Sequence, residues 1–131
     1  MFTNLLNETE REIFMELISK MALCDGENAE EEQALIQNYQ IELNVTQIRD
    51  TDSIEGLIDY FSEKNESIKR IVLFEIWGMV QADGNVGVQE EKAFAYLKEK
   101  FCLGDAKTEQ IITAAKDLQV VYDRIYDAIF D

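Results

Sequence analysis

The sequence contains no histidine, no proline and only two cysteines, and its basic residues are far fewer than its acidic ones. The absence of histidine removes the commonest transition-metal ligand and the side chain that most often acts as a general base near neutral pH. The absence of proline, together with only six glycines in 131 residues, leaves long helical patterns unbroken. Since no strand pattern separates these segments, the sequence predicts one all-α domain over residues 1–131.

The shortage of bases sets the charge of the chain. Twenty-seven acids against 12 bases give a formal net charge of −15. Such a surface disfavours nucleic acid, whose phosphates need patches of lysine and arginine, and it disfavours anionic membranes. The expected partners are therefore cations or an unidentified protein with a basic surface, while the oligomeric state is left open.

Cysteine usage and hydropathy predict the compartment. Cys24 and Cys102 show no CxxC spacing, which indicates buried thiols in a reducing environment. Residues 1–10 carry acids where a signal peptide would carry bases and a long apolar run. No stretch reaches the ~18 apolar residues that a membrane-spanning helix needs. We therefore expect a cytoplasmic protein without direct membrane insertion.

A short phrase, Asp-Gly with a glutamate seven positions after the aspartate, occurs twice and 58 residues apart. The copies are Asp25-Gly26 with Glu32 and Asp83-Gly84 with Glu90. Each copy follows a long apolar helical pattern and precedes a shorter one. The chain is therefore predicted to contain two related helix–acidic loop–helix units, at approximately residues 10–45 and 68–104.

Apolar spacing predicts about seven helices in a compact bundle. Residues 68–82 are apolar nearly all round, which is typical of a central helix. Its lone acid, Glu75, is expected at a solvent-facing edge, and Gly78 is expected where another helix approaches closely. After Gly104, one helix is expected through Ala115, and a separate last helix is expected to bury an apolar face. That face comprises Leu118, Val121, Tyr122, Ile125 and Ile129.

Three interpretations of the duplicated loop are possible. An EF-hand fits only the back half of the second copy, because Met79 and Gln81 stand where a calcium loop needs its first oxygen ligands. In a purely structural interpretation, Ala29 and Gly87 are N-caps, and the two glutamates, at the third helical position, reach back to the cap amides.

In the third interpretation the two loops face each other around an ion. Four converging carboxylates, those of Asp25, Glu32, Asp83 and Glu90, would repel one another unless a cation lay between them. Oxygen ligands without histidine select a hard divalent cation, calcium or magnesium. The structural and the cation interpretations both remain open at this point.

The duplicated phrase resembles that of the TerB-like family of tellurite-resistance proteins. Cys24-Asp25-Gly26 with Glu32, and more closely Ala82-Asp83-Gly84 with Glu90, match its Ala-Asp-Gly pattern, and Phe101–Gly104 resembles the start of the family's C-terminal part. The likeness covers roughly residues 10–117, with Ala29 and Gly87 in place of the family's serine. It implies a compact all-helical domain from two related halves.

The resemblance also implies a function. It suggests a non-enzymatic module of bacterial stress responses, with Asp25, Glu32, Asp83 and Glu90 as ligands of a divalent cation. The alternative is an acidic interaction scaffold in which the same loops only hold helix corners. Catalysis is not expected, because the sequence offers neither histidine nor a nucleophile or phosphate-loop motif.

Overall fold

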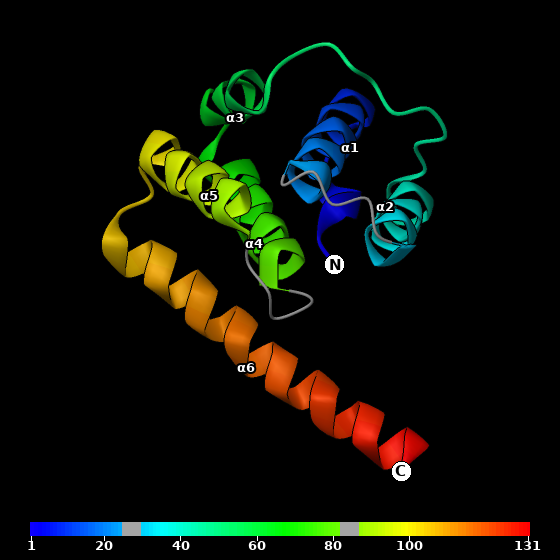
Figure 1. Ribbon diagram of the computed structural model, residues 1–131. Helices are drawn as coiled ribbons and strands as arrows, with labels where there is room; N and C mark the ends of the chain where they lie inside the picture. The colour runs from blue at the N-terminus through cyan, green and yellow to red at the C-terminus, as the bar shows by residue number, and fades with distance from the viewer. Residues whose placement is uncertain (25–29, 82–86) are drawn as a thin grey trace.

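The protein is a bundle of α-helices (Figure 1), seen in a computed structural model that describes residues 1–24, 30–81 and 87–131. Its elements are the 3-10 helix η1 (Thr3–Leu5) and the α-helices α1 (Glu8–Leu23), α2 (Glu30–Leu43), α3 (Ile54–Ser62), α4 (Glu66–Gln81), α5 (Val88–Phe101) and α6 (Asp105–Phe130). No strand occurs in the described ranges. The all-α prediction is confirmed.

Polar side chains set where several helices begin. The Asn7 side chain accepts a hydrogen bond from the Glu10 amide at 2.8 Å, and the Glu10 carboxylate accepts one from the Asn7 amide at 2.8 Å, which is a complete capping box for α1. Asn65 caps α4 by accepting from the Ile68 amide at 2.9 Å. Ser53 caps α3 in the same way through the Gly56 amide. Each cap satisfies an amide that has no partner within its helix.

Two helices form the centre of the bundle. α1 packs against α2, α3, α4 and α5, and α4 packs against α1, α3, α5 and α6. Phe14 of α1 meets Phe61 of α3 edge to face, with ring centroids 6.3 Å apart. The expected central helix over residues 68–82 corresponds to α4, but α1 contributes the larger set of fully buried apolar side chains. These are Phe14, Met15, Leu17, Ile18 and Met21.

A buried carboxylate fastens the segment between α2 and α3 to α1. Glu16 is fully buried, and it accepts hydrogen bonds from the Thr51 amide at 2.8 Å, the Thr51 hydroxyl at 2.9 Å and the Asp52 amide at 3.0 Å. Lys20, one turn further along α1, donates to the same carboxylate at 3.0 Å. A single acid thereby fixes the path of a connection that has no secondary structure of its own.

The prediction for the C-terminal region is wrong in two respects. Residues 105–130 form the single 26-residue helix α6 instead of two helices, so the described part of the chain holds six α-helices and η1. No glycine or proline lies within this segment, and the polar pair Lys116-Asp117 does not interrupt a helix. Val121, Tyr122, Ile125 and Ile129, expected to be buried, are exposed, while Leu118 is half-buried.

Gly78 and the two cysteines also differ from expectation. Gly78 is exposed, and a methyl group built on it would meet nothing within 4 Å, so none of the described helices approaches it closely. Cys24 is half-buried and Cys102 is exposed. Cys102 lies just beyond α5 with a φ of 48°, a left-handed helix cap that places its side chain at the surface.

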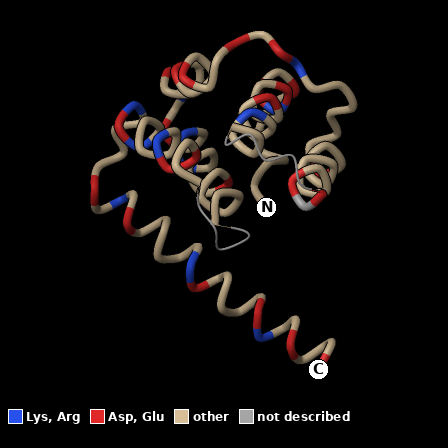
Figure 2. Tube along the Cα trace, viewed as in Figure 1, with Lys and Arg blue, Asp and Glu red and all other residues tan. Residues whose placement is uncertain are grey.

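Charge is spread over the whole bundle. Every α-helix carries acidic residues, as the red positions of Figure 2 show. None of the helices, over the residues described, is long and apolar enough to cross a membrane.

Candidate functional site

The four predicted metal ligands are only partly described. Glu32 and Glu90 are each the third residue of a helix, α2 and α5 respectively, and both are half-buried. Gly87 is the N-cap of α5, as the structural interpretation requires for Glu90. Asp25, Asp83 and the predicted cap Ala29 lie outside the described residues. Within the described ranges, no three cysteine, aspartate or glutamate side chains form a group that could hold a metal ion.

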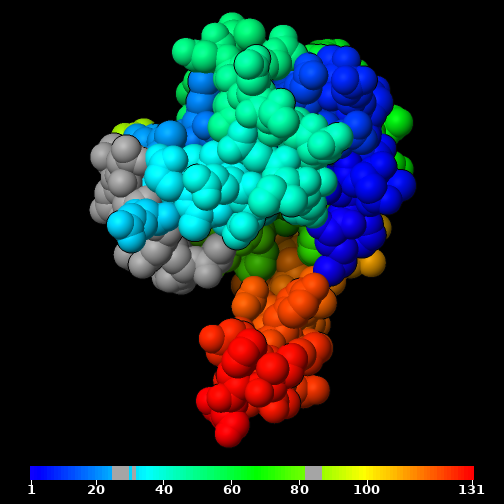
Figure 3. Space-filling model, turned by 90° about the vertical axis from the view of Figure 1, so that its right-hand side faces the viewer, coloured from blue at the N-terminus to red at the C-terminus, as the bar shows by residue number. Residues whose placement is uncertain are grey.

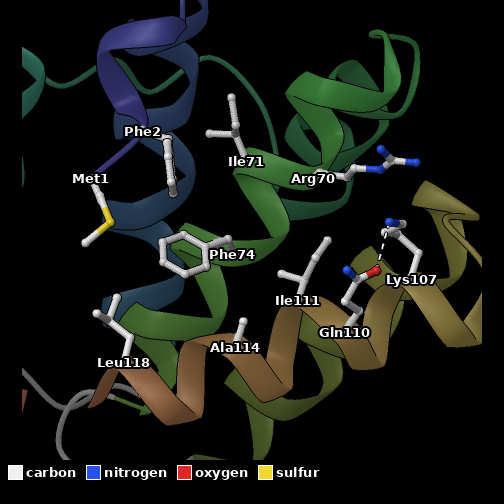
Figure 4. Close-up of a pocket in the computed structure, with 10 residues that line it drawn as sticks. All are labelled: Met1, Phe2, Arg70, Ile71, Phe74, Lys107, Gln110, Ile111, Ala114 and Leu118. Atoms are coloured by element: carbon white, nitrogen blue, oxygen red, sulfur yellow. Dashed lines mark hydrogen bonds between the residues drawn. The ribbon is translucent and has the colours of Figure 1, made fainter. Parts of the chain in front are cut away.

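An apolar groove lies between α4, α6 and the N-terminal segment (Figure 4). We call it the α4–α6 groove; its volume is about 540 Å³. Its walls are mainly apolar side chains from these three elements. They include Phe2, Ile71, Phe74, Ile111, Ala114 and Leu118. Phe2 and Phe74 pack edge to face with centroids 5.5 Å apart, which fixes one wall against α4.

A carboxylate of α4 holds the N-terminal wall of the groove in place, and the sequence-based prediction of its exposure is wrong. Glu75 is buried, not at a solvent-facing edge, and it accepts hydrogen bonds from the Met1 amino group at 2.8 Å and the Phe2 amide at 2.9 Å. Glu42 of α2 accepts from the same amino group at 2.9 Å. Burial lowers the pKa of the amino group, but the two carboxylates outweigh this effect and raise its pKa above 8.0.

The polar side chains of the groove gather at one end. Arg70, Lys107 and Gln110 stand together there (Figure 4), and the Lys107 ammonium donates to the Gln110 side chain at 2.8 Å. One guanidinium nitrogen of Arg70 bonds Glu66 at 2.8 Å. Its Nε is buried and has no acceptor among the described residues. The groove thus offers an apolar floor and a cationic end, which suit an apolar segment carrying an acid.

Beyond the groove, α6 leaves the bundle. Its C-terminal half stands apart from the rest of the molecule in Figures 1 and 3. One face of this half is apolar, at the spacing i, i+3, i+4, i+7 and i+11; we call it the α6 stripe. It consists of Leu118, Val121, Tyr122, Ile125 and Ile129. Leu118 belongs to both features, so the α6 stripe continues directly into the α4–α6 groove.

Sequence reasoning found the residues of the α6 stripe but assigned them to the core. Periodicity gives the same signal for an apolar face that meets its own bundle and for one that meets another molecule. No local sequence pattern could predict the groove, because its walls come from three separate segments, residues 1–2, 70–74 and 107–118.

Comparison of the chain with protein-family models, with curated proteins and with solved structures finds no match.

Proposed function

We propose that this protein is a non-enzymatic interaction module of the cytoplasm, and that the α6 stripe and the α4–α6 groove form its docking surface. The observation that carries this proposal is the exposure of large apolar side chains on α6. Within the α6 stripe, Val121, Tyr122, Ile125 and Ile129 are between 41% and 67% exposed. A contiguous apolar patch of this kind on an otherwise charged protein is typical of a protein–protein interface.

The chemistry of the groove supports binding over catalysis. Its described lining contains no carboxylate, thiol or hydroxyl group; its polar side chains are two cations and an amide, and the Met1 amino group is paired with Glu75 and Glu42. These groups can orient an acidic partner by charge-assisted hydrogen bonds. General acid–base catalysis would need a titratable group near neutral pH, which this set does not supply.

Site-specific photo-cross-linking in the host cell tests the docking surface. A photoreactive phenylalanine analogue at Ile125 lies within the α6 stripe, whereas the same analogue at Asp123 lies two residues away, on the opposite side of the helix. We expect a discrete protein adduct from position 125 and little from position 123. Equal yields at the two positions, or none at 125, would count against an interface on the α6 stripe.

A second candidate function is cation binding at the paired corners, as in the TerB-like resemblance. The observation that favours it is a repeat in the positions of the helices. Adding 58 to the residue numbers that bound α1 and α2 gives the bounds of α4 and α5. The same addition to Asn7, which caps α1, gives Asn65, which caps α4. We infer a duplicated unit, with Glu32 and Glu90 at equivalent positions.

In this second candidate function, Asp25 and Asp83 would complete an oxygen-only ligand set for calcium or magnesium. Such a cation would orient the two corners and neutralise part of the net charge of −15. This would make the protein a divalent-cation-dependent module of a bacterial stress response. Its role would be to bind a partner when the ion is present.

Calorimetric titration with calcium and with magnesium tests the cation site. We expect saturable binding to the wild type and its loss in Glu32→Gln/Glu90→Gln. The variant Glu55→Gln/Glu99→Gln, which removes the same charge at two exposed positions, is the control and should bind as the wild type does. If the wild type binds neither ion at millimolar concentration, the two Asp-Gly…Glu loops have only a structural role.

A further inference from the structure

We propose that the partner of the docking surface is a second copy of this chain. In this dimer the two α6 helices pack antiparallel, and the C-terminal half of each lies along the α4–α6 groove of the other. The inference rests on the proposed function, because it names the partner of the same surface. It is carried by the residue spacing of α6, by two charges beside the α6 stripe and by the cationic end of the groove.

The spacing of α6 matches a coiled-coil seam. Ile111, Leu118 and Ile125 recur every seven residues. Ala114, Val121 and Ala128 form a second series with the same period, three residues later. These two series are the a and d positions of a heptad, whose average spacing of 3.5 residues keeps one face of the helix toward a partner.

An antiparallel arrangement pairs large with small side chains along this seam. Antiparallel helices set each a position opposite a d position of the partner. With Leu118 opposite Val121 of the second copy, Ile125 lies opposite the second copy's Ala114. In the same register Ile111 lies opposite the second copy's Ala128. Each layer then contains one larger and one smaller side chain, which favours close packing.

The charges beside the seam select the same arrangement. Asp117 and Arg124 occupy successive g positions, where antiparallel helices place g opposite g. In the register above, Asp117 of each copy faces Arg124 of the other, so the pair occurs twice by symmetry. In a parallel dimer g faces e, and Asp117 and Arg124 would meet Tyr122 and Ile129 instead. Charge complementarity therefore favours the antiparallel form.

The far end of the groove completes the fit. The same register brings Asp131 of the second copy beside Gln110, at the end of the groove where Arg70 and Lys107 stand (Figure 4). The buried Nε of Arg70 lacks an acceptor among the described residues. The Asp131 carboxylate of the incoming helix supplies an acceptor of the required charge.

Ionic strength separates this dimer from a complex with a basic protein. Each copy carries a net charge of −15, so the long-range electrostatic force between two copies is repulsive. Added salt screens this repulsion and should strengthen a dimer that is held by an apolar seam. A complex with a basic partner should respond in the opposite way, because salt weakens its attraction.

The experiment is the measurement of molar mass across concentration and ionic strength, by sedimentation or light scattering on the full chain. We expect a reversible dimer, favoured by salt. Val121→Asp should halve the mass at a concentration where the wild type is dimeric. Val120→Asp, the same substitution at an adjacent exposed residue away from the seam, should leave the mass unchanged. Circular dichroism and thermal melting must show that both variants remain folded.

Charge variants test the register. Asp117→Arg and Arg124→Asp should each weaken self-association, because each creates two like-charged pairs in the homodimer. The double variant should restore it, and a mixture of the two single variants should form a heterodimer. A mixture that stays monomeric while the wild type dimerises would overturn the antiparallel register.

The outcomes distinguish this proposal from the proposed function. A wild type that is monomeric at every salt concentration, or a Val121→Asp variant with the wild-type mass, would overturn self-association through α6. If position 125 still cross-links to a different protein in the cell, the interaction function stands and only its partner changes. If position 125 also gives no adduct, both proposals fail.

Discussion

Glu16 provides a direct test of how a buried acid stabilises this bundle. Its carboxylate is inaccessible to solvent and accepts hydrogen bonds from the Thr51 amide and hydroxyl, the Asp52 amide and the Lys20 ammonium. Burial alone raises the pKa of a carboxyl group, but these donors outweigh burial and lower the pKa of Glu16 from 4.5 to about 2. We expect Glu16→Gln to destabilise the protein at neutral pH.

The expected loss of stability in Glu16→Gln follows from the pKa of Glu16. The difference between 4.5 in the unfolded chain and about 2 in the folded protein corresponds to ~3 kcal/mol of stability carried by the ionised form. Because the folded pKa is the lower one, this contribution is fully present above pH 4.5. It is lost as the pH falls through 4.5 toward 2. Glu16→Gln should therefore cost ~3 kcal/mol at pH 7, and the variant should approach the wild type in strong acid.

Urea unfolding at a series of pH values measures this difference. The control is Glu12→Gln on the same helix, whose carboxylate is 43% exposed and lies 3.9 Å from the Arg49 guanidinium. An exposed pair of this kind contributes less than ~1 kcal/mol, so the control should follow the wild type closely. A Glu16→Gln variant as stable as the wild type at pH 7 would refute this account. So would a deficit that stays constant down to pH 2.

Other predictions concern helix ends and an exposed helical glycine. Gly78→Ala should raise the free energy of unfolding by ~0.5–1 kcal/mol, because an added methyl group meets nothing and alanine favours the helix; a lower melting temperature would contradict this. Asn65→Ala should cost ~1 kcal/mol through loss of the Ile68 amide bond. Asn7→Ala should cost more, because its capping box with Glu10 is reciprocal; equal losses in urea unfolding would show that this reciprocity adds nothing.

Local signals in the sequence predicted most of the helices. The apolar periodicity and the Asp-Gly phrases marked the helix pairs, and Asn7 and Ser53, which cap α1 and α3, are of residue types that favour this position. These features depend on residues within one turn of each other, so the chain carries them locally. The same holds for Glu90, whose place in the first turn of α5 follows from its distance to Gly87.

Local sequence patterns could not predict the contacts between residues far apart in the chain. A lone acid in an apolar helix is ordinarily placed at a solvent edge, since burial of an unpaired charge is costly. Glu75 is buried because the Met1 amino group, 74 residues earlier, reaches it and compensates its charge. Glu16 likewise depends on amides at Thr51 and Asp52. No local pattern contains these pairings, because the donors belong to segments that the fold brings together.

The C-terminal helix shows a second limit of sequence-based prediction: an apolar helix face does not reveal which molecule covers it. The pattern of α6 required its apolar face to be covered, and the simplest cover is the chain's own bundle. α6 packs on α4, but this helix of 26 residues, about 39 Å long, extends past the four-turn α4, and its C-terminal half stands apart from the bundle in Figure 1. The apolar face of α6 continues past the end of α4, and this part of the face also needs to be covered. Since the whole seam of α6, residues 111–128, is complementary to that of a second copy in size and in charge, a second copy of α6 satisfies that requirement.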